Sequence, residues 1–169
     1  EFYNTINKVQ PSLIRTEADE LTYSIHVIIR YEIEKLLIND KIQVSDLPRV
    51  WNEKYKEYLG VEPTSDKVGV LQDMHWSDGS FGYFPSYALG NLYGAQMLYL
   101  GIMKDLPNYE EIIKAGRISE ITTWLAENVH KYGATYEPSV LIEKITGEAL
   151  DAKYFLRYLN EKYSKLYNL

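Results

Sequence analysis

The segment GVLQDMHWSDGSFGYFPSYALGNLYGAQ, from Gly69 to Gln96, combines the residue types that could do chemistry. Its candidate functional side chains are those of Gln72, Asp73, His75, Tyr83 and Tyr87. Histidine and tyrosine on a constrained loop can donate hydrogen bonds to a polarised carbonyl group, and glycines allow a substrate backbone to approach closely. We therefore predict that this segment forms one wall of a catalytic cleft.

The roles of Gln72 and Asp73, which precede His75 in the same segment, are left open by the sequence. Gln72 and Asp73 could contact a substrate, or they could orient His75 by accepting its second ring proton. Asp73 could instead cap the amides of its own loop, which is the usual behaviour of aspartate in a turn. We slightly favour the capping role for Asp73.

Arg15 is a further candidate because its guanidinium presents paired N–H donors. That fork matches the two oxygens of a carboxylate. Arg15 could instead pair with Asp19, one helical turn later, and only brace the start of a helix. Both interpretations stay open at this stage.

The sequence offers no zinc site of its own. The chain contains no cysteine, no HExxH motif, and only three histidines, His26, His75 and His130. None of them has a histidine partner three or four residues away, and carboxylates alone select zinc poorly. We interpret His26, which lies between apolar positions, as a hydrogen-bonded core residue, and we predict no metal ligand in this chain.

The composition limits the class of protein. The chain has 169 residues, 46% of them hydrophobic and 25% charged, which suits one globular domain over residues 1–169. A net charge of −6 without a basic cluster argues against a nucleic-acid partner. No cysteine and no signal-peptide pattern at the first residues favour a cytoplasmic location. The apolar stretch from Tyr87 to Met103 contains Asn91 and Gln96, so we expect a buried helix rather than a membrane span.

The apolar spacing predicts an all-α fold. A long helix is expected from Thr16, which would be its N-cap, to a stop at Asn39-Asp40, and another from Ser45 to a stop at Gly60. Residues 61–86 form one long irregular loop, with a short strand allowed over residues 67–71. The remaining helices are expected over residues 2–8, 87–103, 109–114, 118–131, 138–145 and 151–167.

Two segments together resemble a known family. IRTEAD, from Ile14 to Asp19, and GVLQDMHW, from Gly69 to Trp76, resemble the paired signatures IRxxAD and GxxQDxHW of the thermostable (Taq-type) metallocarboxypeptidases. The continuation SDGSFGYFPSYALGN and the tail TGEALDAKYFLRYLNEKY are also similar to that family. The resemblance covers the whole chain, and two long motifs in the right order make it specific.

The resemblance implies a mostly helical, saddle-shaped zinc peptidase that removes single residues from peptide carboxyl termini and forms homodimers. Its zinc ligands, the HExxH histidines and a downstream glutamate, have no counterpart here, so we expect the carboxyl-terminal third of such an enzyme, with its amino-terminal portion missing. His75 would then donate to the substrate, and Tyr83 or Tyr87 would stabilise the oxyanion. Arg15 would bind the substrate carboxylate.

A second class of function remains open. The chain could be a non-catalytic helical module that acts in dimerisation or binds a peptide in a groove. A split gene, a proteolytic product and a deliberately shortened protein would all give the same sequence. We expect the isolated chain to be inactive, and we expect exposed apolar surface along residues 87–103, where the missing portion would pack.

Overall fold

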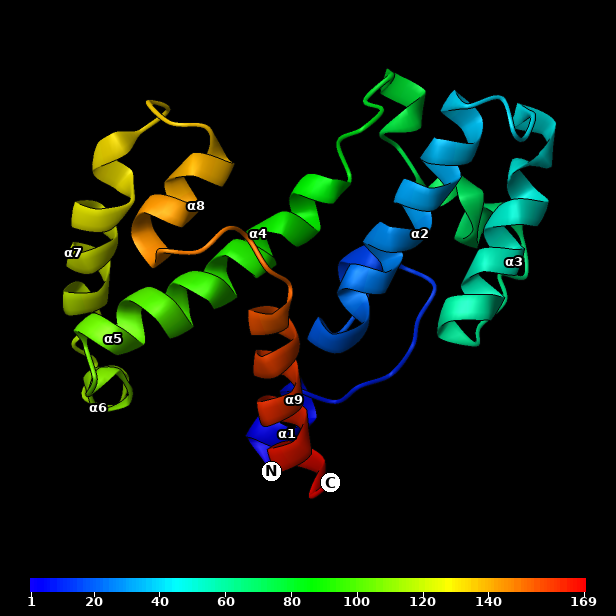
Figure 1. Cartoon of the computed structure of the whole chain (residues 1–169). Helices are drawn as coiled ribbons and strands as arrows, with labels where there is room; N and C mark the ends of the chain where they lie inside the picture. Colours follow the sequence, from blue (N-terminus) through cyan, green and yellow to red (C-terminus); the bar gives the residue numbers. More distant parts are fainter. The chain divides into compact units, whose positions relative to one another are not determined.

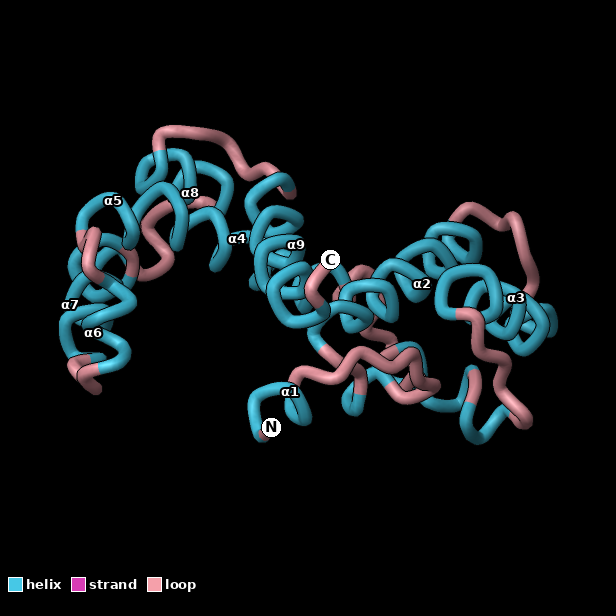
Figure 2. The backbone as a smooth tube through the Cα atoms, turned by 90° about the horizontal axis from the view of Figure 1, so that it is seen from below, coloured by secondary structure: helices cyan, strands magenta, loops and turns pink.

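The computed structural model describes all 169 residues and contains helices and loops but no β-strand (Figures 1 and 2). This confirms the all-α prediction. The backbone divides into two compact units, Glu1–Ala88 and Leu89–Leu169. The division falls inside the helix α4, Pro85–Met97. The expectation of one domain without an internal boundary stays a prediction.

The first unit is built around two packed α-helices. α2 spans Glu20–Ile38 and α3 spans Leu47–Leu59, and a short helix α1, Phe2–Ile6, precedes them (Figure 1). Single 3-10 turns cover Arg15–Glu17, Val44–Asp46, Asp66–Val68, Val70–Gln72 and Trp76–Asp78. The buried core between α2 and α3 comprises Ile29, Ile33, Val50, Trp51, Tyr55 and Leu59.

α2 begins later than the sequence analysis predicted. Its N-cap is Asp19, whose side chain accepts hydrogen bonds from the backbone and the hydroxyl of Thr22, both at 2.9 Å. Thr16 lies one turn earlier in the 3-10 turn, and Ala18 between them is extended, with φ −67° and ψ 144°. The extended residue separates the two turns, so Thr16 does not cap α2.

The start of α3, whose N-cap is Asp46, differs from the prediction, whereas its end agrees with it. A capping box between Gln43 and Asp46 precedes the helix, so the N-terminal cap predicted at Ser45 was wrong. Gly60 ends α3 in the left-handed conformation, with φ 68°, as predicted. A glycine adopts this conformation without the steric cost that a Cβ atom would add.

The long connection from α3 to α4 is irregular, as predicted, but its strand is absent. Residues 67–71 lie in two successive 3-10 turns instead of an extended segment. Gly69 joins these turns at φ −116° and ψ −124°. A Cβ atom there would lie 3.1 Å from the Ser65 carbonyl oxygen and 3.2 Å from the Pro63 Cβ atom. The bend therefore leaves little room for a side chain at position 69.

The second unit consists of helices of unequal length. After α4 come a π-helical segment, Leu98–Ile102, and then α5 (Met103–Asp105), α6 (Tyr109–Lys114), α7 (Ile118–Asn128), α8 (Pro138–Thr146) and α9 (Lys153–Tyr167). The predicted helix over residues 87–103 is thus helical throughout, but it changes from α-helix to π-helix at Leu98. Of its apolar residues Leu89 is exposed, whereas Ala95 and Ile102 are buried.

Gln96 is a buried polar link in this second unit. Its Nε2 atom donates to the Glu148 and Ala149 carbonyl oxygens and to the Thr146 hydroxyl, at 3.0–3.1 Å. Its Oε1 atom accepts from the Asp151 amide at 2.9 Å. The side chain therefore holds the connection between α8 and α9 against α4. None of the helices is both long and apolar enough to cross a membrane.

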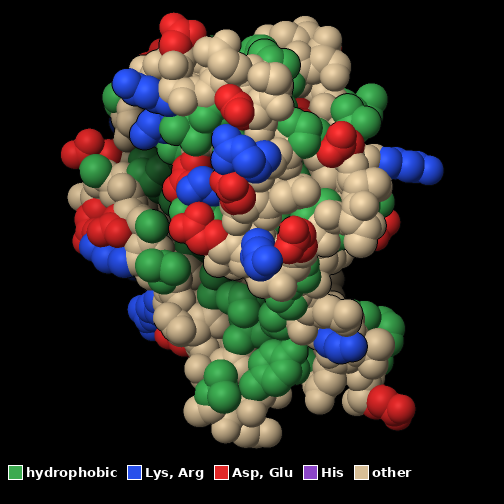
Figure 3. All heavy atoms as spheres, turned by 90° about the vertical axis from the view of Figure 1, so that its right-hand side faces the viewer, with side chains coloured by type: hydrophobic (Ala, Val, Ile, Leu, Met, Phe, Trp, Pro, Cys, Tyr) green, Lys and Arg blue, Asp and Glu red, His purple; other side chains and the backbone are tan.

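The visible face of the first unit mixes charges of both signs. Figure 3 shows acidic and basic side chains interspersed there, without a large patch of one sign. On α3, Arg49 pairs with Glu53 at 3.0 Å and Lys56 pairs with Glu62 at 2.9 Å. A mixture of acidic and basic side chains is typical of a solvated surface rather than of a surface that binds phosphates.

Candidate functional site

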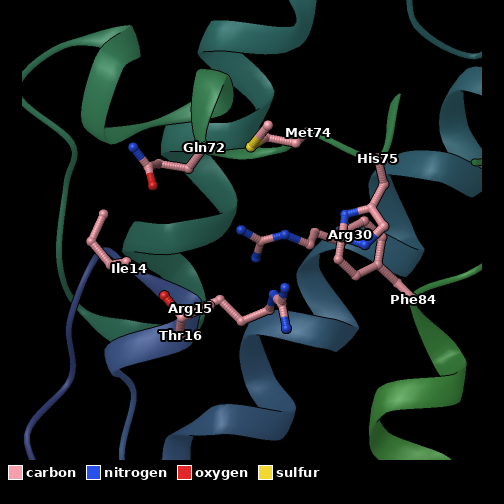
Figure 4. A pocket seen from close by; sticks show the side chains of 8 residues that line it. All are labelled: Ile14, Arg15, Thr16, Arg30, Gln72, Met74, His75 and Phe84. Carbon is pink, nitrogen blue, oxygen red and sulfur yellow. The ribbon is translucent and has the colours of Figure 1, made fainter. Parts of the chain in front are cut away.

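A cavity of about 220 Å³ in the first unit lies between the turn at residues 15–17, α2 and the loop before α4 (Figure 4). It is lined by Ile14, Arg15, Thr16, Arg30, Gln72, Met74, His75 and Phe84. The two segments that resemble the family signatures, 14–19 and 69–76, thus meet at one cavity. Three of the predicted site residues, Arg15, Gln72 and His75, line it.

His75 belongs to a cluster of aromatic rings. Its Nε2 atom lies 3.0 Å from the Tyr87 hydroxyl, and its ring stacks on that of Tyr83, with centroids 5.5 Å apart and planes 21° apart. Phe84, which is buried, packs against the same imidazole with a centroid distance of 4.6 Å. Tyr83 and Tyr87 hold His75 but do not line the cavity themselves. Tyr83 is half exposed.

Arg15 lies on the opposite wall of the cavity from the loop (Figure 4). Its Nη1 atom donates to the Tyr23 hydroxyl at 3.0 Å, and its guanidinium carbon lies 4.5 Å from the centre of the Tyr87 ring. It forms no ion pair with Asp19, whose oxygens accept from the Thr22 and Gln10 amides. The alternative that Arg15 only braces α2 through Asp19 is therefore not the arrangement observed.

Asp73 lies behind the cavity wall. Its Oδ1 atom accepts from the backbone amides of His75 and Trp76, at 2.9 and 3.2 Å. The His75 Nδ1 atom is 4.0 Å from the same oxygen, which is too far for a hydrogen bond. Asp73 thus caps the amides of its own loop, which is the role that the sequence analysis slightly favoured. In this position it supports the backbone of His75.

Gln72 and Met74 form the outer part of the cavity. The Gln72 Nε2 atom donates to the Lys67 carbonyl oxygen at 2.6 Å, so its amide nitrogen is used within the loop. Met74 is one of the most exposed apolar residues of the chain, with 76% of its surface accessible. A flexible thioether at the mouth can adapt to different apolar groups.

Arg30 is a cavity residue that the sequence analysis missed. Its side chain is buried, and its Nε atom lies 3.4 Å from the Asp73 Oδ2 atom. Its Nη1 atom donates to the His26 carbonyl oxygen at 2.9 Å and to the Tyr55 hydroxyl at 3.1 Å. Figure 4 shows the guanidinium groups of Arg15 and Arg30 directed into the same space. The cavity lining therefore contains two guanidinium groups.

Glu34 was also missed, and it too faces the loop from α2. It is buried, and its two carboxylate oxygens accept from the Trp76 Nε1 atom at 2.9 Å and from the Gly82 amide at 3.0 Å. The signal in the sequence was the spacing of His26, Arg30 and Glu34, which places polar groups one turn apart on a face that is otherwise apolar.

His26 is fully buried on α2, and its carbonyl oxygen accepts a hydrogen bond from Arg30. Burial, followed by the positive charges of Arg30 and Arg15, lowers the pKa of His26 from 6.5 to about 4. The imidazole is neutral at neutral pH, and its Nδ1 atom lies 3.0 Å from the Tyr55 hydroxyl. This confirms that His26 is a hydrogen-bonded core residue. Burial also raises the pKa of Tyr55.

The residues present do not fit a catalytic metal. The structure contains no group of three or more His, Cys, Asp or Glu side chains that could hold a metal ion. His26 is engaged with Tyr55, and His75 with Tyr87. His130 lies in a separate 3-10 turn, His130–Tyr132, of the second unit. The charged or titratable side chains that line the cavity are those of Arg15, Arg30 and His75.

Comparison with curated proteins finds close relatives. "Carboxypeptidase 1" of Bacillus subtilis (strain 168) is 49% identical over 169 residues, which are 100% of this chain and 34% of the relative. "Thermostable carboxypeptidase 1" of Pyrococcus furiosus is 43% identical over 163 residues, which are 96% of this chain and 32% of the relative. The chain spans about a third of the length of the curated relatives that it matches.

Solved structures agree with the sequence matches. The M32 carboxypeptidase of Deinococcus radiodurans R1 superposes with a TM-score of 0.95 at 41% identity, over 99% of this chain and 34% of that one. Trypanosoma cruzi metallocarboxypeptidase 1 superposes with a TM-score of 0.92 at 40% identity, over 96% of this chain and 33% of that one. The model of the family described as carboxypeptidase Taq (M32) metallopeptidase matches residues 1–163. The chain therefore belongs to the carboxypeptidase Taq (M32) metallopeptidase family.

Proposed function

We propose that this chain is the carboxyl-terminal portion of a zinc metallocarboxypeptidase that removes single residues from peptide carboxyl termini. The observation that carries the proposal is Arg15, a guanidinium in the cavity wall that forms no ion pair within the chain. A carboxypeptidase needs a cation for the free carboxylate of its substrate. Arg15 supplies that cation beside His75.

The surroundings of Arg15 orient its fork. The rings of Tyr87 and Phe84 lie 4.5 and 5.7 Å from its guanidinium carbon, and the hydroxyl of Tyr23 accepts from its Nη1 atom. Aromatic faces hold a guanidinium plane while leaving the N–H edges available. Arg15 thus reaches the cavity with a defined orientation before a substrate carboxylate binds.

His75 and the two tyrosines contact the reacting part of the substrate. His75 donates a hydrogen bond from Nδ1 to a substrate carbonyl, and its Nε2 atom then accepts from the Tyr87 hydroxyl 3.0 Å away. Either Tyr83, which is half exposed beside His75, or Tyr87 stabilises the oxyanion. Gln72 contacts the substrate at the outer wall, while Asp73 acts through the backbone of His75.

The metal-binding residues of the enzyme lie outside this chain. Zinc is held by the amino-terminal portion of the same enzyme, because the residues present here do not fit a metal site. The complete enzyme is a cytoplasmic homodimer, without a nucleic-acid partner. The isolated chain binds no catalytic zinc and cleaves no peptide.

The test compares a peptide with a free carboxyl terminus and the same peptide as its amide, using the complete enzyme. We expect Arg15→Ala to lower kcat/KM for the free acid roughly 100-fold, because the buried charge pair with the substrate is lost. Arg49→Ala, which removes an exposed arginine on α3, is the matched control and keeps the wild-type value. Wild-type kcat/KM in Arg15→Ala would refute the carboxylate role.

A further inference from the structure

Glu34 lies on α2 behind the loop that carries His75 and Tyr83. Its side chain is buried and does not line the cavity. Its Oε1 atom accepts from the Trp76 indole Nε1 atom at 2.9 Å, and its Oε2 atom accepts from the Gly82 amide at 3.0 Å. Both carboxylate oxygens are thus bonded to one loop from a neighbouring helix.

The two donors to Glu34 are direct chain neighbours of two candidate site residues. Trp76 follows His75, and Gly82 precedes Tyr83. Between the donors the chain turns through Trp76–Asp78 and through Gly79, with φ 81°, and Gly82 itself has φ 76°. The carboxylate therefore closes this turn by joining its two ends.

Closing the turn brings two rings together. His75 and Tyr83 stack with centroids 5.5 Å apart, although seven residues of chain separate them. We propose that Glu34 is a positioning residue for the peptidase reaction, because its carboxylate sets the relative position of His75 and Tyr83. This proposal rests on the proposed function. Glu34 acts through the loop and does not touch the substrate.

A carboxylate suits this role better than an amide of the same shape. Each of its oxygens accepts one N–H group, and charge-assisted hydrogen bonds are stronger than neutral ones. In Glu34→Gln one acceptor becomes an NH₂ donor that faces either the Trp76 indole N–H or the Gly82 N–H. One buried contact is then lost with almost no change in volume.

The experiment uses the complete metalloenzyme and two isosteric variants of α2. Glu34→Gln is compared with Glu32→Gln, whose carboxylate contacts Lys54 and Tyr58 of α3, away from the loop. We expect Glu34→Gln to speed amide hydrogen exchange over residues 77–83 and to lower kcat about 10- to 100-fold, with KM within about twofold of wild type. Glu32→Gln is expected to change neither quantity.

A second measurement separates positioning from a general structural role. Glu34→Gln is introduced into the double variant His75→Ala/Tyr83→Phe, where we expect no further loss of kcat because positioning acts only through those two side chains. A further loss equal to that in the wild-type background would overturn the proposal. If Glu34→Gln fails to fold, Trp76→Phe removes the indole donor to Glu34, together with part of the ring that packs against Trp51, and is judged by the same criteria.

The outcomes distinguish this proposal from the function on which it rests. Wild-type kcat in Glu34→Gln with faster exchange over residues 77–83 would overturn the positioning role alone. Wild-type kcat in the His75→Ala/Tyr83→Phe enzyme would overturn the proposed function as well. Loss of kcat in the double variant, together with the expected behaviour of Glu34→Gln, would support both.

Discussion

The Nε2 atom of His75 lies 3.0 Å from the hydroxyl of Tyr87, which stands in the first turn of α4. The same tyrosine presents its ring to the Arg15 guanidinium carbon at 4.5 Å. Tyr87 therefore links the two segments that carry the family signatures, through its hydroxyl on one side and its ring on the other. The two contacts can be separated by mutation.

Tyr87→Phe removes the hydroxyl and keeps the ring beneath Arg15. In the complete enzyme we expect kcat to fall roughly 10- to 100-fold while KM for a free-acid peptide changes little, because the hydrogen bond to His75 is lost and the carboxylate contact is kept. Steady-state kinetics measures both constants. Tyr99→Phe, which removes a hydroxyl bonded to Glu161 in the second unit, is the control. An unchanged kcat in Tyr87→Phe would contradict the prediction.

His26 predicts a dependence of stability on pH. The pKa of His26 is about 4 in the folded chain and 6.5 unperturbed, so the unfolded chain binds more protons between these values. The contribution of this group is therefore fully present above pH 6.5 and is lost as the pH falls towards 4. The loss is at most about 3 kcal/mol.

Urea unfolding at pH 7 and at pH 4.5 measures this effect. We expect His26→Gln to be less stable than wild type at pH 7, because Gln leaves the packing with Tyr55 incomplete. The free energy of unfolding of His26→Gln should also fall less than that of the wild type when the pH is lowered from 7 to 4.5. His130→Gln, an exposed histidine, serves as control and should follow the wild type. Equal losses in wild type and His26→Gln would show that other groups cause the acid sensitivity.

Gly101 predicts a packing effect in the second unit. A Cβ atom there would lie 2.6 Å from the Trp124 ring, which is buried and tied to Asp105 through its Nε1 atom at 2.8 Å. Gly101→Ala should therefore lower the free energy of unfolding by about 1–3 kcal/mol. Gly94→Ala, with nothing within 4 Å, should raise it by about 0.5–1 kcal/mol. Denaturant melts check both values, and equal effects would refute the argument.

Much of the first unit could be predicted from its apolar spacing. The repeat of Ile29 and Ile33 indicates the buried face of α2, and Gly60 marks the end of α3. The start of α2 could not be fixed, because Thr16 and Asp19 are both good N-caps, and the extended Ala18 that decides between them is a property of the backbone.

The candidate site was only partly predictable for a different reason. Arg15 and His75 stand in signatures, so their residue types and spacing indicated them. Arg30 and Glu34 lie within a helical pattern, where charged residues are usually solvated. Their burial depends on Asp73 and Trp76, which approach from about 40 residues later in the chain. A pattern within one helix contains no information about such a distant partner.

The spacing of His26, Arg30 and Glu34 has a consequence for which sequence changes α2 can accept. His26 contacts Tyr55, Arg30 contacts Tyr55 and Asp73, and Glu34 contacts Trp76. All three side chains point the same way because they are four residues apart. One inserted residue between His26 and Arg30 would rotate the side chains of both Arg30 and Glu34 by about 100° away from their partners. An insertion beyond Ile38, where α2 ends, would leave all three in place. Length variation in this protein should therefore collect after α2 and avoid its middle.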